Sequence, residues 1–362
     1  MNRITIAPYQ LFCVFFLGRA LSSMLYSPTM VGAVNPTGSI IGMLIGAFVQ
    51  LALLIPMFLF LKNNDGEEFH NILLKRTGKI GFVITVLYLI YCMMAAVAVV
   101  CEMSYFMANF TRDYDMIFYL LVVSGVALYV AKYGLQTIVR VGFILFAFLA
   151  LAIVVIGLAG ISHMNIYNLK PLTDNCWNEI FDGFFRYSSA NMEMMLLPVL
   201  APFVKTGAGG TRKTAILAVG VTTLFSAYIM FFSATVLGQY MEKVAYPYFM
   251  TLASINLFGM RRMDVLQIYL WLAIAAVKVA LFFFVAVHLG KSMVPSGRRK
   301  PVFWVLAVVM LGTALAIGCS LHYFSGLSFI VRNVWVLGFL IAFIPSVLLI
   351  CGAVKRRKKD AQ

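Results

Sequence analysis

Ten apolar stretches, each about the length of a membrane-spanning helix, fill almost the whole of this 362-residue chain. A hydrocarbon core about 30 Å thick requires roughly 20 predominantly apolar residues per helix. Hydrophobic residues make up 62% of the chain and charged residues 11%, which excludes an ordinary soluble domain. We therefore expect an all-α polytopic membrane protein forming a single integral membrane domain over residues 1–362. The expected transmembrane spans are 8–31, 39–61, 80–108, 114–132, 141–161, 180–203, 214–237, 264–288, 301–320 and 334–354.

Lysine and arginine are distributed unequally between the two sides of these spans. With the N-terminus inside, nineteen of them fall on the cytoplasmic side and six on the opposite side. Cytoplasmic loops of membrane proteins carry such an excess, so both termini are expected in the cytoplasm, with residues 355–362 as a basic tail. The net charge of +15 is then explained by topology, and no nucleic-acid partner is required.

Motifs for catalysis or cofactor binding are absent from the sequence. The four histidines lack metal-ligand spacing, and the chain has no Walker loop, nucleotide fingerprint or G-x-S-x-G motif. We expect no enzyme activity, no catalytic residues, no cofactor and no metal site. The bilayer and a small molecule are the expected partners.

Two spans five helices apart resemble one another, which predicts an internal repeat. The first reads Leu17-Gly-Arg-Ala-Leu-Ser-Ser23, and the sixth reads Phe185-Arg-Tyr-Ser-Ser-Ala-Asn191. An odd number of helices per half gives an inverted repeat, here 1–161 followed by 162–354. In such folds the first helix of each half is interrupted, so helices 1 and 6 would expose backbone groups to a ligand. The alternative is that the small residues only allow close helix packing, as Gly42-x-x-x-Gly46 does in the second span.

Two connecting segments also have readable patterns. The segment after the second span, 65–76, has an acidic start, a basic end and apolar residues at 69, 72 and 73, which predicts a short surface helix at the cytoplasmic interface. Residues 240–262 are rich in aromatic and small residues, and they form either an external lid or an interfacial helix.

Charged side chains inside the spans indicate the functional site. A charge in hydrocarbon costs roughly 2.5 kcal/mol or more, so these side chains need partners. Depth along the helices suggests an outer Glu102–Arg186 pair and a deeper group of Arg19, Glu193 and Lys278, with Asp182 near a boundary. We predict that these charges line a polar pathway or pocket; the alternative is that they only hold helices together. The substrate-binding candidates are Gly18, Arg19, Ser22, Ser23, Tyr91, Tyr187, Ser188, Ser189 and Asn191, and the candidate charge network is Glu102, Arg186, Glu193 and Lys278.

The charge balance bears on the ligand. Three buried cations face two anions, which leaves a vacancy that an amino-acid carboxylate would fill; counting Asp182 removes this vacancy. Lys278 either gains and loses a proton during a transport cycle, because burial disfavours its charged form, or stands permanently where other transporters hold sodium.

Several segments together resemble the spore germination permeases, the B subunits of nutrient germinant receptors within the amino acid–polyamine–organocation superfamily. They are Ile4-Thr-Ile-Ala-Pro-Tyr-Gln10, Asn109-Phe-Thr-Arg-Asp113, Lys132-Tyr-Gly-Leu-Gln-Thr-Ile-Val-Arg140, Asn168-Leu-Lys-Pro171, Met192-Glu193 with Pro198, and Arg262-Met-Asp264 with Trp271 and Lys278. Two positions depart from the family pattern, because Asn35-Pro-Thr-Gly-Ser39 replaces an Asp-Trp pair and Gln136 replaces a glutamate.

The resemblance implies a ten-helix fold of two inverted five-helix repeats with helices 1 and 6 unwound. It also implies a receptor subunit of the spore inner membrane that senses a small nutrient, often an amino acid, beside a larger membrane subunit and a lipoprotein. An autonomous proton-coupled amino-acid permease would use the same pocket, so it is the alternative. A structural subunit without a ligand is disfavoured, since it has little reason to retain five intramembrane charges.

Overall fold

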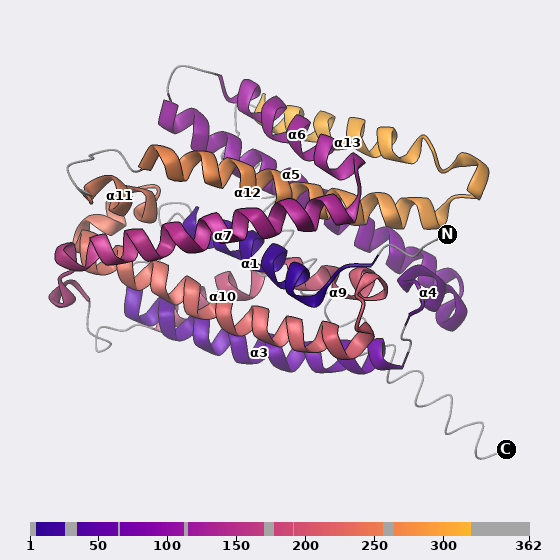
Figure 1. Ribbon diagram of the computed structural model, residues 1–362, viewed down its shortest axis with the longest axis horizontal. Coiled ribbons are helices and arrows are strands. Elements are labelled where there is room, and N and C mark those ends of the chain that lie inside the picture. Colours follow the sequence, from indigo (N-terminus) through magenta and orange to yellow (C-terminus); the bar gives the residue numbers. More distant parts are fainter. Residues whose placement is uncertain are drawn as a thin grey trace, which may run out of the picture.

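The computed structural model describes residues 5–25, 35–63, 66–111, 115–169, 177–190, 192–255 and 264–319. Within these ranges the side chains of residues 53, 111, 182, 185–190, 192, 242, 264 and 266 are not described. The expected tenth span, 334–354, and the basic tail lie outside the described residues. The rest form a bundle whose long helices run roughly parallel to one axis (Figure 1).

Helices make up nearly all of the described chain. The long ones are α1 (Pro8–Met24), α3 (Pro36–Lys62), α5 (Lys79–Thr111), α6 (Met116–Lys132), α7 (Leu135–Gly160), α8 (Trp177–Ala190), α10 (Gly207–Leu237), α12 (Asp264–Met293) and α13 (Val302–Gly318). Shorter elements are α4 (Phe69–Thr77), α9 (Leu197–Leu200) and α11 (Pro247–Ser254), with 3-10 turns at 161–163, 166–168, 192–196, 201–203, 238–243 and 296–298.

Five of the described helices are long and apolar enough to cross a membrane, namely Pro36–Lys62, Lys79–Phe110, Leu135–His163, Gly207–Met241 and Gln267–Met293. The shorter apolar segments are Met116–Lys132, Glu193–Phe203 and Val302–Gly318. The chain is therefore a multi-pass helical membrane protein, as its hydropathy predicts. The total of ten spans and the inverted repeat stay predictions.

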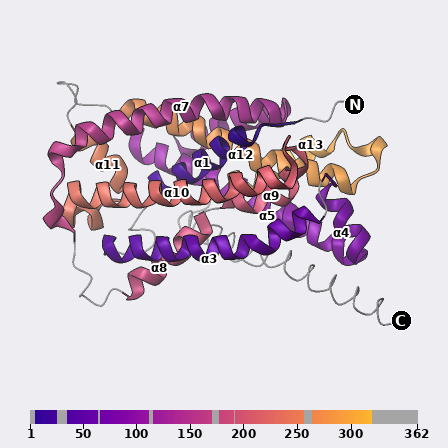
Figure 2. The ribbon, with the colours of Figure 1, turned by 60° about the horizontal axis from the view of Figure 1, so that its bottom comes forward.

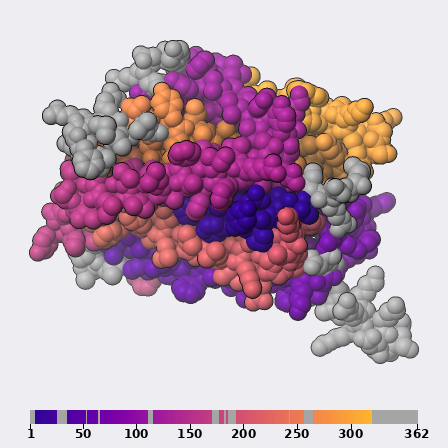
Figure 3. All heavy atoms as spheres, in the orientation of Figure 1, coloured from indigo at the N-terminus to yellow at the C-terminus, as the bar shows by residue number. Residues whose placement is uncertain are grey.

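Helix α12 forms the centre of the bundle and α7 its edge. In the most apolar window of each helix, 78% of residues are buried in α12 but only 17% in α7. Helix α12 packs against α1, α5, α6, α7 and α13. Helix α1 is also largely buried, and on the face shown in Figure 3 it reaches the surface only between α7 and α10. The side chains of α1 and α12 therefore meet in the interior.

Helices α3 and α8 make a close backbone contact, which Figure 2 shows below the centre. A Cβ atom on Gly42 would overlap the Ile180 carbonyl, and one on Gly183 would overlap the Ser39 carbonyl. The prediction that Gly42 serves close helix packing is confirmed, and its partner is the first half of the sixth span.

Helices α7 and α10 begin earlier than the expected spans, at Leu135 rather than 141 and at Gly207 rather than 214. Arg140, Arg212 and Lys213 lie in these extra turns with exposed side chains. Exposed cations are tolerated at a polar helix end. Hydropathy therefore predicts where the apolar segment of each helix begins, and it does not predict where the helix itself begins.

The two expected helix interruptions have different outcomes. Helix α1 runs unbroken to Met24, and the Ser22 and Ser23 hydroxyls donate to the Gly18 and Arg19 carbonyls one turn earlier. The residues directly after Leu25 lie outside the described part of the chain. In the sixth span the α-helix ends at Ala190, and 3-10 turns continue the chain from Met192.

One end of the bundle, on the right in Figure 1, carries the surface helix α4. Phe69, Ile72 and Leu73 are buried, while the Lys75 ammonium lies 2.9 Å from the Glu67 carboxylate at the surface. The predicted short helix with an apolar face is therefore present. At the same end, the Ile6 amide donates to the Phe203 carbonyl (2.8 Å) and the Lys205 amide donates to Ile6 (3.0 Å), which ties the entry of α1 to the end of the sixth span.

At the opposite end, α11 folds over the bundle. Tyr246, Tyr248 and Phe249 are buried against Phe106 and Trp271, with ring centroids 4.8–6.4 Å apart. The described part of segment 240–262 is therefore packed onto the helices, as a cap over their ends.

Candidate functional site

The site is built around a buried ion pair between α12 and the sixth span. The Lys278 ammonium lies 2.8 Å from Glu193 Oε1, and both side chains are 1% exposed. The ammonium also donates to the Gly18 carbonyl at 2.8 Å and to Ser22 Oγ at 2.7 Å, both on α1. The ammonium thus has two hydrogen-bond acceptors on α1 and a carboxylate counter-ion in the sixth span, the kind of partners that a buried charge requires.

Gly18 allows α1 to approach this pair. A Cβ atom at position 18 would overlap the Glu193 carboxylate, which is itself held by Lys278. The absence of a side chain therefore brings the α1 backbone into contact with the sixth span. The sequence marks Gly18 as a candidate, and the structure shows that its role is steric, with its carbonyl as a ligand for the ammonium.

Helix α1 is also linked to α10 beside the ion pair. Ser23 Oγ lies 2.7 Å from Ser226 Oγ, and Ser226 donates to the Thr222 carbonyl at 2.8 Å. Arg19 is buried one turn before these serines on α1, with 3% exposure. Ser226 was not predicted from sequence, because a hydroxyl in an apolar helix is usually satisfied by its own backbone.

Tyr91 on α5 borders the same interior. It is 1% exposed, it interacts electrostatically with Glu193, and its ring packs edge-on against Phe282 at 6.4 Å. Tyr91 and Lys278 reach the centre from different helices, and α5 and α12 pack closely against each other. Tyr91 therefore faces the interior of the bundle.

Glu102 lies further along α5 and, unlike Glu193, is in contact with no cation among the described residues. It is partly buried, and no hydrogen bond or ion pair joins it to another described residue. Lys278 and Tyr246 are close enough to interact with it electrostatically. Because the Lys278 ammonium is already bound to Glu193, Glu102 is a carboxyl group without a direct counter-ion among the described residues.

Three polar groups on α12 and beside α11 also have no hydrogen bond to a described residue. The Tyr246 hydroxyl, the Trp271 indole Nε1 and the Gln267 amide Nε2 are buried and make no hydrogen bond with other described residues. Trp271 and Gln267 precede Lys278 on α12 by 7 and 11 residues, so they share its face and lie toward the α11 end. Buried polar groups are normally hydrogen-bonded, so their concentration here indicates a place for a polar ligand.

The other predicted residues divide as follows. The structure brings Gly18, Ser22, Glu193 and Lys278 into direct contact. The side chains of Arg186, Tyr187, Ser188 and Ser189, and the whole of Asn191, lie outside the described residues, as does any Glu102–Arg186 pair. That these groups bind substrate or couple charge stays a prediction.

The fold and this site define the class of protein. A multi-pass helical bundle with charged side chains in contact at its centre is the arrangement in which intramembrane ionisable residues mark substrate or ion pathways. The sequence profile of the spore germination proteins, the spore permeases, matches residues 5–317, and the chain belongs to this family. None of the curated proteins compared with the chain matches it.

Proposed function

We propose that this protein is a membrane subunit of a spore germinant receptor that binds a small amino acid as its zwitterion. The ligand would occupy the space between the Lys278–Glu193 pair and the aromatic cap of α11. The observation that carries the proposal is that the Glu102 carboxyl group has no ion pair among the described residues, beside a Lys278–Glu193 pair whose charges neutralise each other.

The charges of the site fit both ends of an amino acid. Glu102 would accept hydrogen bonds from the ligand ammonium, and Trp271 and Tyr246 would place aromatic faces beside that ammonium. The carboxylate would be bound by the predicted groups of the first and sixth spans, which include Arg19, Tyr187, Ser188, Ser189 and Asn191. The anion vacancy predicted from sequence would take the ligand carboxylate, and Glu102 would take its ammonium.

The proposal includes the setting implied by the family. The protein would lie in the spore inner membrane with both termini in the cytoplasm, beside a larger membrane subunit and a lipoprotein. Its fold would be that of the amino acid–polyamine–organocation superfamily, with two inverted five-helix repeats. The end of the bundle that carries α4 would be cytoplasmic. We call it the basic end, because the exposed cations Lys132, Lys213 and Lys291 lie there.

An autonomous proton-coupled permease is the second candidate, and Glu102 supports this one also. A carboxyl group without a fixed cation can bind and release a proton within a transport cycle. Proteoliposomes separate the two candidates, because a permease accumulates labelled amino acid when a proton gradient is imposed, whereas a receptor subunit binds it without accumulation.

A stabilisation screen tests the ligand class. Purified protein is heated with each amino acid, with nucleosides, and with the N-acetyl and carboxamide derivatives of every amino acid that raises the unfolding midpoint. We expect stabilisation that is lost when either the ammonium or the carboxylate is blocked.

Glu102→Gln is the matching variant, because it removes the charge and keeps the shape of the side chain. It should lower affinity about tenfold or more, as loss of a charged hydrogen bond is worth roughly 1.5–3 kcal/mol. Glu67→Gln is the control, since its carboxylate forms an exposed pair with Lys75. Equal binding of the N-acetyl derivative, or unchanged affinity in Glu102→Gln, would rule out this reading of the site.

A further inference from the structure

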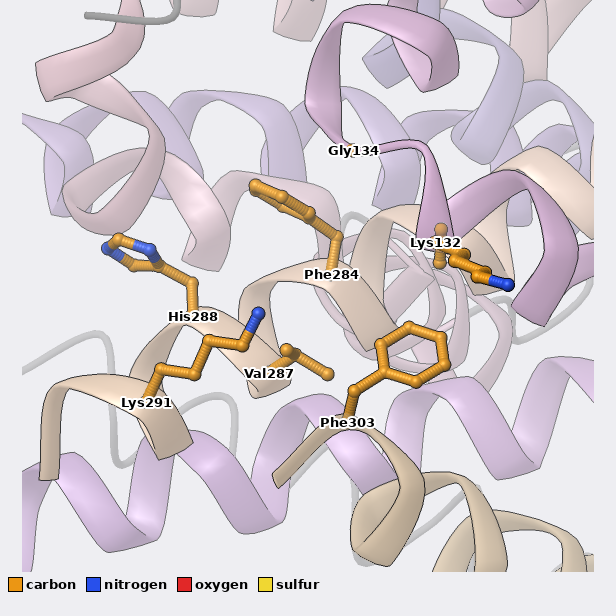
Figure 4. A pocket seen from close by; sticks show the side chains of 8 residues that line it. Lys132, Gly134, Phe284, Val287, His288, Lys291 and Phe303 are labelled. Carbon is orange, nitrogen blue, oxygen red and sulfur yellow. The ribbon is translucent and has the colours of Figure 1, made fainter. Parts of the chain in front are cut away.

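A second pocket lies at the α4 end of the bundle, away from the Lys278 site (Figure 4). Its volume is about 140 Å³, and it is lined by Ala131, Lys132, Gly134, Phe284, Val287, His288, Lys291 and Phe303. These residues come from the α6–α7 turn, the last turns of α12 and the start of α13. The pocket has no part in the ligand site described above.

The polar part of this lining is basic. Figure 4 shows the Lys291 side chain rising past Val287, with His288 beside it and Gly134 on the turn above Phe284. No carboxylate is among the lining residues, and Lys291 makes no hydrogen bond or ion pair with a described residue. The nearby Glu68 interacts electrostatically with His288. Lys291 therefore favours an anion in the pocket, while the Lys132 side chain in Figure 4 points away from Lys291, and its ammonium lies over the Trp304 ring.

Helix α7 adds to this potential. It begins at Leu135, directly after Gly134 (φ +87°), and Gly134 supplies no side chain to cap its first-turn amides. A helix N-terminus carries about half a positive charge. It supports Lys291 in favouring an anion.

The surface around the pocket shows that it faces the lipid interface. Along α6 the exposed residues change from apolar Leu121 and Val126 to Tyr129, and then to Lys132 at the helix end. On α13 the exposed Val305 and Val308 follow Trp304, whose ring lies 5.9 Å from the Lys132 ammonium. This order, from apolar residues through aromatic residues to cations, is the one expected across a membrane boundary.

We propose that this pocket binds the phosphate-bearing headgroup of an anionic phospholipid from the leaflet at the basic end of the bundle. Lys291 and Lys132 would bind the phosphate, His288 would donate a hydrogen bond, and Phe284, Val287 and Phe303 would contact the glycerol and the first methylenes. Basic pockets between helix ends at the cytoplasmic face are recurrent headgroup sites. A bound lipid would join the α6–α7 turn to α12, the helix that carries Lys278.

The test titrates phosphatidylglycerol into full-length protein in phosphatidylcholine mixed micelles and measures the rise in the unfolding midpoint. Lys291→Gln is the test variant, because Lys291 is exposed and its replacement leaves the core intact. It should weaken the apparent affinity about fivefold, the factor that corresponds to about 1 kcal/mol for one interfacial lysine. Adding Lys132→Gln should weaken it about fivefold again.

Lys213→Gln is the matched control, since Lys213 is exposed at the same end of the bundle but outside the pocket. The proposal predicts that this variant keeps wild-type affinity. Equal weakening in Lys213→Gln would show a diffuse surface charge effect and overturn the site. Competition by millimolar inorganic phosphate or glycerol 1-phosphate would identify a soluble anion as the occupant and would overturn the lipid assignment. A wild-type protein that does not distinguish phosphatidylglycerol from phosphatidylcholine would do the same.

Discussion

Replacing the Lys278–Glu193 pair, singly and together, separates its structural from its functional role. Both side chains are 1% exposed and their charged atoms are 2.8 Å apart, so neither replacement is relieved by solvent. Lys278→Met leaves a buried carboxylate without its cation, which costs about 3–5 kcal/mol. Glu193→Gln should fall at the low end of this range, because the ammonium keeps the Gly18 carbonyl and Ser22 Oγ as acceptors.

The double variant should recover most of the lost stability. With both charges removed, a methionine and a glutamine fill nearly the same volume, and such exchanges of buried ion pairs can be near neutral. Ser22 also remains able to donate to the Gly18 carbonyl, at 3.4 Å. We therefore expect a coupling energy of about 3 kcal/mol between the two positions.

The measurement is reversible unfolding of the four proteins in mixed micelles, followed by ligand-dependent stabilisation of those that fold. We expect the double variant to fold and to fail to respond to the nutrient. If the double variant loses as much unfolding free energy as the two single variants lose together, the two positions are not energetically coupled and the reasoning is wrong. If the double variant folds and responds normally, Lys278 only holds helices together.

Four further changes test other parts of the structure. Gly18→Ala should destabilise the folded protein by about 1–3 kcal/mol, because the added methyl group displaces the Glu193 carboxylate. Gly220→Ala is the control, since Gly220 on α10 has open space where its Cβ would lie, and the unfolding midpoints of the two variants are compared. Gly42→Leu should separate α3 from α8 and weaken nutrient-dependent stabilisation; wild-type behaviour would show that this contact is dispensable. His70 is buried in α4, and its Nδ1 donates to Thr85 Oγ1 (2.9 Å), because the Thr85 hydroxyl donates to the Gly81 carbonyl. Burial lowers the pKa of His70 below its usual value of 6.5. The folded state therefore favours neutral His70, so the contribution of this residue to stability is fully present above about pH 6.5 and is lost as pH falls through the folded pKa. The unfolding midpoint of His70→Asn should depend less on pH over this window than that of the wild-type protein. Finally, cysteines at Tyr167 and Gly297, exposed at opposite ends of the bundle, should be labelled from outside and from the cytoplasm respectively, and the reverse pattern would exclude the proposed orientation.

The sequence was a good guide wherever one helix decides the outcome. Apolar runs located the five long apolar helices that the structure describes, because each span must satisfy its own backbone in hydrocarbon regardless of its neighbours. The pattern of 65–76 predicted α4 for a similar reason, since its apolar face and terminal charges are local features. Helix boundaries at Leu135 and Gly207 were missed, because polar first turns carry no hydropathy signal.

Depth along the helices was enough to group Glu193 with Lys278, which the structure places in contact. It could not assign the remaining acceptors of Lys278. Gly18 and Ser22 stand about 260 residues away, and their role depends on how closely α1 approaches the sixth span. Only packing shows that the Lys278 ammonium has two hydrogen-bond acceptors on α1 besides its Glu193 counter-ion, and that Glu102 is left without a counter-ion among the described residues.

The sequence by itself therefore determined that this chain is a helical membrane protein with charges inside its spans, and its motifs indicated the spore germination family. It did so because hydrophobicity and helical periodicity act within one segment. The tertiary structure decided that Lys278 and Glu193 neutralise one another, that Glu102 has no ion pair among the described residues, and that the ends of α6, α12 and α13 enclose a basic pocket. Those outcomes depend on distances between helices, and no single segment of the sequence encodes them.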